Sequence, residues 1–135
     1  MREIKFRAFD KYMKCMCDVV KINFRCQHLM LRTKQKEQYE TSFEEVELLQ
    51  CTGLKDKNGV DIYEGDIIKV HDDKSRFNFD IAKAVYNRQY NGFVLASVDF
   101  EDDTWDPFRR HFPEEHVEVI GNIYENPELI GENHD

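Results

Sequence analysis

Short runs of alternating apolar and polar residues, separated by turn residues, follow one another along most of the chain. The run "IKFRAFD" at residues 4–10 has the period-two pattern of a strand with one buried face. The run "CMCDVVKINF" at residues 15–24 also alternates, but its phase slips between Val19 and Val20, which predicts a bulge or a strand buried on both faces. Five further runs complete the series: "VDIY", "IIKV", "FNFDIAKAVY", "FVLASV" and "HVEVIGNIY". Together they predict a mainly β protein, built as a sheet or a small barrel.

Turn residues lie between these runs. The pair Asn58-Gly59 predicts a hairpin with a type I′ turn, in which both turn residues have positive φ. The "EGD" at residues 64–66 predicts a second corner, and the later "NG" pair at 91–92 predicts a hairpin with a longer loop. Gly121 lies inside the last run, where it predicts a bulge or a close approach of two backbones.

Three segments depart from the strand pattern. In "TSFEEVELL", Ser42 and Glu45 form a capping-box signature that predicts one or two helical turns, with a strand from about Val46 as the alternative. Residues 32–40 are polar and aperiodic, which predicts an exposed loop or a hairpin tip. Residues 99–115, "DFEDDTWDPFRRHFPEE", are expected to form an acidic loop.

Composition makes a folded core the expected state. The chain has 135 residues, of which 41% are hydrophobic and 13% aromatic, enough for one domain with an N-terminal extension or subdomain. No apolar run approaches the ~20 residues of a membrane span, and "MREIKFRAFD" lacks the apolar centre of a signal peptide. We therefore expect a cytoplasmic protein whose four cysteines are thiols.

Charge is divided unevenly along the chain. The net charge is −8, but residues 1–40 carry ten Lys and Arg against five Asp and Glu, a net +5. Residues 41–135 carry nine against twenty-two, a net −13. Such a division is explained by packing of the halves on each other, by head-to-tail association of copies, or by a separate partner for each half.

Three blocks carry a resemblance to a known family: "REIKFRAFD", "TGLKDKNGVDIYEGDIIKV" and "VEVIGNIYENPELI". In this order they resemble the YopX family of small bacteriophage and prophage proteins. The resemblance implies a mainly β fold, with an N-terminal β portion at 1–51 and an SH3-type barrel at about 52–130 within a second part, 52–135. It implies no activity, because the family has no established biochemical role. The chain departs from the family pattern at two positions. Phe9 stands where the family usually has Trp, and Cys51 stands where the family usually has an aromatic residue.

The central block contains residues that could bind phosphate or a metal. Gly59 and Gly65 are separated by a strand-like run and precede no helix, so the spacing indicates turn glycines and not a phosphate-binding loop. Glu64 and Asp66 flank Gly65 as a carboxylate pair available for acid–base work, but acidic residues beside a turn glycine are usually turn formers.

The cysteines raise the question of zinc. Cys15, Cys17, Cys26 and His28 supply three thiols and an imidazole, but the spacing is not that of paired zinc ligands. Residues two apart on a strand are roughly 6.6 Å apart, whereas tetrahedral zinc needs sulfurs about 3.8 Å apart. A bend near Val19 could bring them closer. Buried apolar thiols are the expected state, and no metal is predicted.

Two further sets of polar residues carry no recognisable chemistry. The acidic residues of the expected loop are Asp99, Glu101, Asp102, Asp103 and Asp106. They lack the glycine of a calcium loop, so we expect a solvated loop in which Trp105 could anchor a basic partner. The histidines, at positions 28, 71, 111, 116 and 134, lie in no nucleophile motif. No catalytic or cofactor-binding residue is predicted.

The leading hypothesis is a non-enzymatic accessory protein that binds another protein, either a host protein or a second copy. The alternative is a nucleic-acid-binding module that uses the basic residues Lys5, Arg7, Lys11, Lys14, Lys21, Arg25, Arg32, Lys34 and Lys36. That alternative predicts binding that weakens with salt and with charge reversal at Lys34 or Lys36. A third possibility is an acidic mimic of DNA that inhibits a host protein. A membrane partner is not expected.

Overall fold

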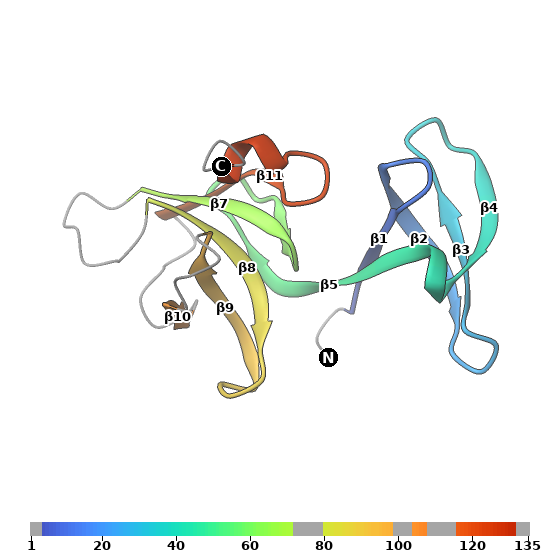
Figure 1. Ribbon diagram of the computed structural model, residues 1–135, viewed down its shortest axis with the longest axis horizontal. Helices are drawn as coiled ribbons and strands as arrows, with labels where there is room; N and C mark the ends of the chain where they lie inside the picture. The colour runs from blue at the N-terminus through green and yellow to red at the C-terminus, as the bar shows by residue number, and fades with distance from the viewer. Residues whose placement is uncertain (1–3, 72–79, 99–103, 108–115, 132–135) are drawn as a thin grey trace. The chain divides into compact units, whose positions relative to one another are not determined.

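The structure is a computed structural model that describes residues 4–71, 80–98, 104–107 and 116–131 (Figure 1). The chain divides into two compact units, Met1–Cys51 and Thr52–Asp135, which we call the first and second units. Each unit has its own buried core. Among the described residues, no helix has the length and hydropathy that crossing a membrane requires.

The first unit is an antiparallel meander to which a fifth strand returns. Its strands are β1 (Phe6–Asp10), β2 (Cys15–Asn23), β3 (His28–Arg32), β4 (Gln38–Ser42) and the first part of β5 (Val46–Lys55). Consecutive strands pair through short turns, and β5 then pairs with β1, which gives the order β4-β3-β2-β1-β5. Figure 1 shows this meander in the blue to teal part of the ribbon.

The phase slip in the second run is a bulge, as predicted. The register of β2 against β3 shifts between Val19 and Lys21, and Val20 is exposed. On the N-terminal side of the bulge, Cys17 faces a core that contains Ala8, Leu29 and Leu31. The extra residue therefore lets one strand keep its apolar side chains on the core face.

The predicted helical segment is a single 3₁₀ turn, η1 (Phe43–Glu45), and β5 begins directly after it at Val46. Ser42 makes no side-chain capping bond. Glu45, the N3 residue of a capping box, is the last residue of this turn, so the helix that a capping box would start does not continue. The polar residues 32–40 include the β3–β4 tip at 33–37, but β4 begins at Gln38.

The second unit contains a five-stranded antiparallel sheet with the order β10-β9-β8-β7-β11. Its strands are β7 (Asp66–Val70), β8 (Ile81–Asn87), β9 (Gly92–Ser97), β10 (Trp105–Pro107) and β11 (Val117–Asn122). The second part of β5 continues into this unit and pairs with β6 (Asp61–Tyr63). Both ends of the five-stranded order are open within the described residues, so the SH3-type barrel is not confirmed.

Five strands, β6, β7, β8, β9 and β11, supply the buried core of the second unit. Ile62 of β6, Ile68 of β7 and Leu95 of β9 are completely buried and pack in one cluster with Val117 of β11. Ile67 is also completely buried, although it points to the opposite side of β7 from Ile68. β7 is therefore covered on both faces, which explains why its run "DIIKV" does not alternate.

Two local predictions about turns and loops were wrong. In the Asn58-Gly59 turn only Gly59 has a positive φ, +80°, and its N–H donates to the Asp56 carbonyl, so the turn is not type I′. Trp105 and Asp106 lie in the short strand β10, paired with β9, and not in a loop. Pro107 is tolerated there because β10 is an edge strand.

The other turn predictions are confirmed. Gly65 has a φ of +87° at the predicted corner. The β8–β9 hairpin has a loop of four residues, 88–91. The register of β11 against β7 shifts between Val119 and Gly121, which places the predicted bulge at this glycine.

Candidate functional site

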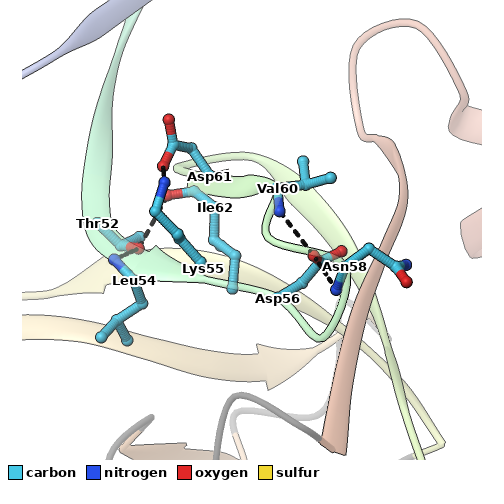
Figure 2. Close-up of polar contacts among 8 residues, drawn as sticks. All are labelled: Thr52, Leu54, Lys55, Asp56, Asn58, Val60, Asp61 and Ile62. Atoms are coloured by element: carbon cyan, nitrogen blue, oxygen red, sulfur yellow. Dashed lines mark hydrogen bonds and ion pairs between the residues drawn. The ribbon is translucent and has the colours of Figure 1, made fainter.

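The central block is organised by the carboxylate of Asp56, at the end of β5. Its Oδ1 accepts the N–H groups of Asn58, at 2.8 Å, and Val60, at 2.9 Å (Figure 2). The chain around it is pinned on both sides, because Thr52 Oγ1 donates to the Ile62 carbonyl and Lys55 Nζ contacts Asp61 Oδ1 at 2.7 Å. The side chain of Asp56 thus replaces the positive-φ geometry of a type I′ turn as the device that closes this hairpin.

The same carboxylate joins the central block to the last strand. Asp56 Oδ2 accepts the N–H of Val119 at 2.9 Å, across 63 positions of sequence. Asp56 is buried, which raises the pKa of its carboxyl, but the three backbone N–H donors outweigh burial and hold this pKa below its ordinary value. A carboxylate with all these bonds has a structural role and is not available for acid–base chemistry.

The Glu64-Gly65-Asp66 corner is equally occupied by structure. Asp66 is almost completely buried, and its Oδ2 accepts the N–H of Tyr63 at 2.8 Å. The N–H of Gly65 donates to the Ala84 carbonyl, and the Gly65 carbonyl accepts the N–H of Ile123. Gly59 and Gly65 are thus turn glycines, as predicted. Burial of Asp66 removes the carboxylate pair that Glu64 and Asp66 suggested.

A turn after β11 completes this cluster. Asn122 is buried, and its Oδ1 accepts the N–H groups of Tyr124, at 3.0 Å, and Glu125, at 2.8 Å. Tyr124 then packs on the corner, so that a Cβ at Gly65 would lie 2.9 Å from its Cε2. The middle and last blocks of the sequence therefore meet in one set of interlocked turns.

The four residues considered for zinc are not brought together. Cys15 and Cys17 lie at the start of β2, whereas Cys26 and His28 are exposed at the far end of the β2–β3 hairpin. Cys17 and Asn23, the last residue of β2, are separated by six residues of strand, roughly 20 Å. Among the described residues, no three His, Cys, Asp or Glu side chains form a group that could hold a metal ion.

Cys15 and Cys17 instead belong to a compact polar cluster with Asp10 and Tyr39. The two sulfurs are 3.8 Å apart, and Cys17 Sγ lies 3.6 Å from Tyr39 Oη. Tyr39 donates its hydroxyl proton to Asp10 Oδ2 at 2.5 Å, while Asp10 Oδ1 accepts the N–H groups of Tyr12 and Met13 in the β1–β2 turn. Nothing in the sequence signals Tyr39, because it lies 29 residues from Asp10.

The pKa values of this cluster have opposite directions. Burial raises the pKa of Asp10. The hydrogen bond from Tyr39 and the two backbone N–H groups lower this pKa by more than burial raises it, so the pKa of Asp10 lies below its ordinary value. Burial raises the pKa of Tyr39, and its hydrogen bonds with Asp10 and Cys17 raise it more. The phenol therefore stays protonated and keeps its proton directed at Asp10.

We expect Tyr39→Phe to lower the free energy of unfolding by about 1–2 kcal/mol at neutral pH, because Asp10 loses a hydrogen bond. The pKa of Tyr39 is raised in the folded state above its ordinary 10.0, so its contribution is complete below about pH 10 and is lost as pH rises further. Urea unfolding at about pH 8 and 10.5 should show a smaller alkaline loss in the variant. Tyr12→Phe, at an exposed position, is the matched control and should change neither value.

Exposed aromatic side chains gather at the end of the β8–β9 hairpin, residues 86–93, which we call the hairpin end. Tyr86 packs edge-on against Phe93, with ring centroids 5.7 Å apart, and Tyr90 packs against Trp105 at 5.6 Å. Tyr86 and Tyr90 remain 45% and 47% exposed. β7 pairs with β8 only at residues 81–83, and β10 pairs with β9 only at 94–96, so the hairpin end extends beyond its neighbours (Figure 1).

One histidine is placed next to a carboxylate. His71 Nε2 lies 2.8 Å from Glu118 Oε1, and Lys57 Nζ lies 3.8 Å from the same oxygen. All three side chains are partly exposed, which is the setting of a surface ion pair of low energy. His28 is exposed and His116 is partly buried, while residues 111 and 134 lie outside the described residues.

The structure describes the basic residues of the first unit from Lys5 on, but not most of the acidic residues of the expected loop. Asp99, Glu101, Asp102 and Asp103 lie outside the described residues. The basic residues of the first unit are mostly exposed, with Lys5, Arg7 and Arg32 partly buried. The unit boundary after Cys51 assigns three glutamates to the first unit, so that its net charge is +2, from ten basic and eight acidic residues. The second unit, with nine basic and nineteen acidic residues, has a net charge of −10.

Comparison with known proteins identifies a family and a similar solved structure. A model of the YopX protein family matches residues 5–131. The crystal structure of protein EF1440 from Enterococcus faecalis is similar, with 27% sequence identity and a TM-score of 0.63, over 96% of this chain and 99% of that protein. No curated protein is similar enough to count as a relative. The family match spans both units and includes β1 and the middle and last blocks that form the interlocked turns, so the chain belongs to the YopX family.

Proposed function

We propose that the chain is a bacteriophage or prophage accessory protein that works as a non-enzymatic binding module, with a protein as its partner. The observation that carries the proposal is the hairpin end. It projects beyond the neighbouring strands and presents the exposed side chains of Tyr86, Arg88 and Tyr90, with Trp105 packed behind Tyr90. Tyr, Trp and Arg are the residue types that dominate binding energy at protein interfaces.

The two aromatic pairs lie on opposite faces of the hairpin, which suits insertion into a partner. Phe93 shares its face with Leu95 and the core, whereas Trp105 is opposite Ala96, on the other face. Apolar contacts are therefore available on both sides of the hairpin end. The Tyr86 hydroxyl also donates to Asn91 Oδ1 at 2.5 Å, which holds its ring before any partner arrives. Such preorganisation lowers the entropy cost of binding.

Chemistry by buried carboxylates has less support. Asp10, Asp56 and Asp66 are the buried acidic residues among those described, and each accepts backbone N–H groups that shape a turn. Binding of nucleic acid by the first unit also has less support, because a net charge of +2 is a weak attraction for phosphates. An acidic DNA mimic remains a specific version of protein binding, in which DNA competes for the partner.

We expect Tyr86→Ala with Tyr90→Ala to weaken partner binding at least thirtyfold, because losing a hot-spot aromatic costs about 2 kcal/mol or more. The immobilised protein would capture partners from a bacterial lysate, and the captured protein would be purified and titrated by calorimetry against each variant. Tyr12→Ala, an even more exposed tyrosine in the first unit, is the matched control and should bind normally.

Equal affinity of the wild type, the double variant and the control would remove the hairpin end as the contact surface. Addition of duplex DNA to the titration separates the versions of the proposal. Competition by DNA would support the DNA mimic, whereas unchanged affinity would support an ordinary protein interface. Thermal melting of the double variant confirms that the loss of the Tyr86–Asn91 bond has not unfolded the unit.

A further inference from the structure

The first unit contains two cysteines placed for reaction with each other. Cys15 and Cys17 are separated by one residue of β2, so both point to the same side of the strand, and their sulfurs are 3.8 Å apart. The Cα atoms of such residues are roughly 6.6 Å apart, near the upper end of the range that a disulfide spans. Rotation of the two side chains could therefore close the bond without refolding of the strand.

The two thiols differ in access to solvent. Cys15 is partly exposed, next to the β1–β2 turn, whereas Cys17 is 2% exposed and packs in the core with Ala8 and Leu31. A dissolved oxidant can therefore reach Cys15 first. Cys17 can react only with a group that is already attached to its neighbour.

The polar cluster limits where Cys17 can donate its proton. The only proton of the Tyr39 hydroxyl is donated to Asp10, so in the 3.6 Å contact the Tyr39 oxygen can only accept, and the thiol of Cys17 donates either there or to the Cys15 carbonyl, 4.0 Å away. The sulfur of Cys17 then presents its lone pairs to Cys15. This geometry assigns different roles to the two cysteines, with Cys15 as the attacking thiol and Cys17 as the resolving thiol.

We propose that Cys15 and Cys17 form a reversible redox site, which small disulfides such as oxidised glutathione convert to an intrastrand disulfide. The thiolate of Cys15, after losing its proton to solvent, attacks one sulfur of the oxidant, and the S–S bond of the oxidant breaks and releases a thiolate. That thiolate takes up a proton. The thiolate of Cys17 then attacks the Cys15 sulfur and displaces the second small thiolate, which receives the proton that Cys17 has lost.

The sum of these steps is balanced: two protein thiols and one small disulfide give one protein disulfide and two small thiols. A disulfide across such a wide Cα separation is strained, and strained disulfides are readily reduced. This site is independent of the hairpin end and of the binding function proposed for it.

The test uses native full-length protein, oxidised glutathione and tryptic mapping. Cleavage after Lys14 and Lys21 releases "CMCDVVK", which contains Cys15 and Cys17 and neither of the other two cysteines. After oxidation and alkylation, we expect this peptide to have lost two hydrogens and to carry no alkyl group. Dithiothreitol should restore both thiols. A peptide that stays alkylated at both positions, or that keeps glutathione on Cys15, would overturn the proposal.

Two variants test the assigned order of reaction. Cys17→Ala should stop at a stable glutathione adduct on Cys15, because the resolving thiol is gone. Cys15→Ala should leave Cys17 unmodified while the protein is folded. If Cys17 in that variant reacts as fast as the exposed Cys26, the roles are wrong. The peptide that contains Cys26 serves as the internal control in every sample, and it should carry glutathione without forming an intrachain bond.

Discussion

Replacement of Asp56 by alanine should lower the free energy of unfolding of the second unit by about 3–5 kcal/mol. The carboxylate accepts three backbone N–H groups, and hydrogen bonds to a charged acceptor contribute about 1.5–3 kcal/mol each without being additive. The loss reaches two places at once, because it frees the turn at Asn58 and removes the bond to Val119 in β11. Urea denaturation followed by tryptophan fluorescence would measure it.

The matched control for this experiment is Asp61→Ala, five residues away. Asp61 pairs with Lys55 at 2.7 Å, but the pair is partly exposed, and such surface pairs contribute about 0–1 kcal/mol. We therefore expect the control to unfold almost as the wild type does. If the free energy of unfolding falls equally in both variants, the hydrogen bonds of the Asp56 carboxylate do not stabilise this hairpin.

The same residue predicts how acid affects stability. The pKa of Asp56 is lower in the folded state than its ordinary 3.8, so its contribution is complete above that value. The contribution is lost as pH falls through the folded pKa, below about pH 4. Asp56→Asn should therefore flatten the acid limb of a plot of stability against pH. The limb should not vanish, because the pKa of Asp10 is also lowered.

Replacement of Gly65 by alanine should be the second most damaging change, with a loss of about 3–4 kcal/mol. A φ of +87° costs an L-residue roughly 1–2 kcal/mol, and the new Cβ would also lie 2.9 Å from Cε2 of Tyr124. Gly59→Ala separates the two causes, because Gly59 has a φ of +80° but no atom within 4 Å of an added Cβ. We expect the control to lose only the 1–2 kcal/mol of backbone strain.

A double-mutant cycle with Tyr124→Ala identifies the steric part. Truncating Tyr124 removes the clash, so Gly65→Ala should cost about 1–2 kcal/mol less in that background. Equal costs of Gly65→Ala in the two backgrounds would mean that the ring moves aside freely. Equal costs of Gly65→Ala and Gly59→Ala in the wild type would mean the same. Equilibrium unfolding in urea measures all five proteins under one condition.

The sequence predicted the strands better than the way in which they assemble. Alternation identified the mainly β class, and the phase slip at Val19 identified the bulge, because both depend on local side-chain periodicity. The closed barrel is not confirmed, because closure depends on which strands become edges. Pro107 is an edge-strand signal for β10, but no pattern in the sequence makes β11 the other end of the same sheet. The expectation of a barrel came from the family resemblance, which does not specify which strands lie at the edges of the sheet.

The turn at Asn58-Gly59 shows why a local rule failed. Asn-Gly is a strong signal for a type I′ turn, but the rule assumes that the backbone alone closes the hairpin. Here the side chain of Asp56 accepts two of the turn's N–H groups, and only Gly59 adopts positive φ. The third hydrogen bond to Asp56 comes from Val119, which is 63 residues away and therefore invisible to a rule based on local sequence.

The polar clusters were less predictable than the strands. Asp10 and Tyr39 are joined through three strand pairings, and neither residue type at either position suggests the other. The bend that could bring Cys15 and Cys17 close was anticipated near Val19, yet the cysteines reach 3.8 Å on the regular part of β2, before the bulge. The four residues considered for zinc do not form one site, because Cys26 and His28 lie at the other end of the hairpin from Cys15 and Cys17.

The position of β11 at the edge of the second sheet has a consequence for synthesis of the chain. β11 pairs with β7, although β8, β9 and β10 all come between them in the sequence. Long-range pairings of this kind form slowly, because a large loop must close first. During synthesis on the ribosome, one edge of β7 therefore stays unpaired until Val117–Asn122 has been made. The hydrogen bond from Val119 to the Asp56 carboxylate is also absent until then. An uncovered edge invites pairing with other chains, so the time before residue 117 emerges is when the nascent protein is most exposed to misassembly.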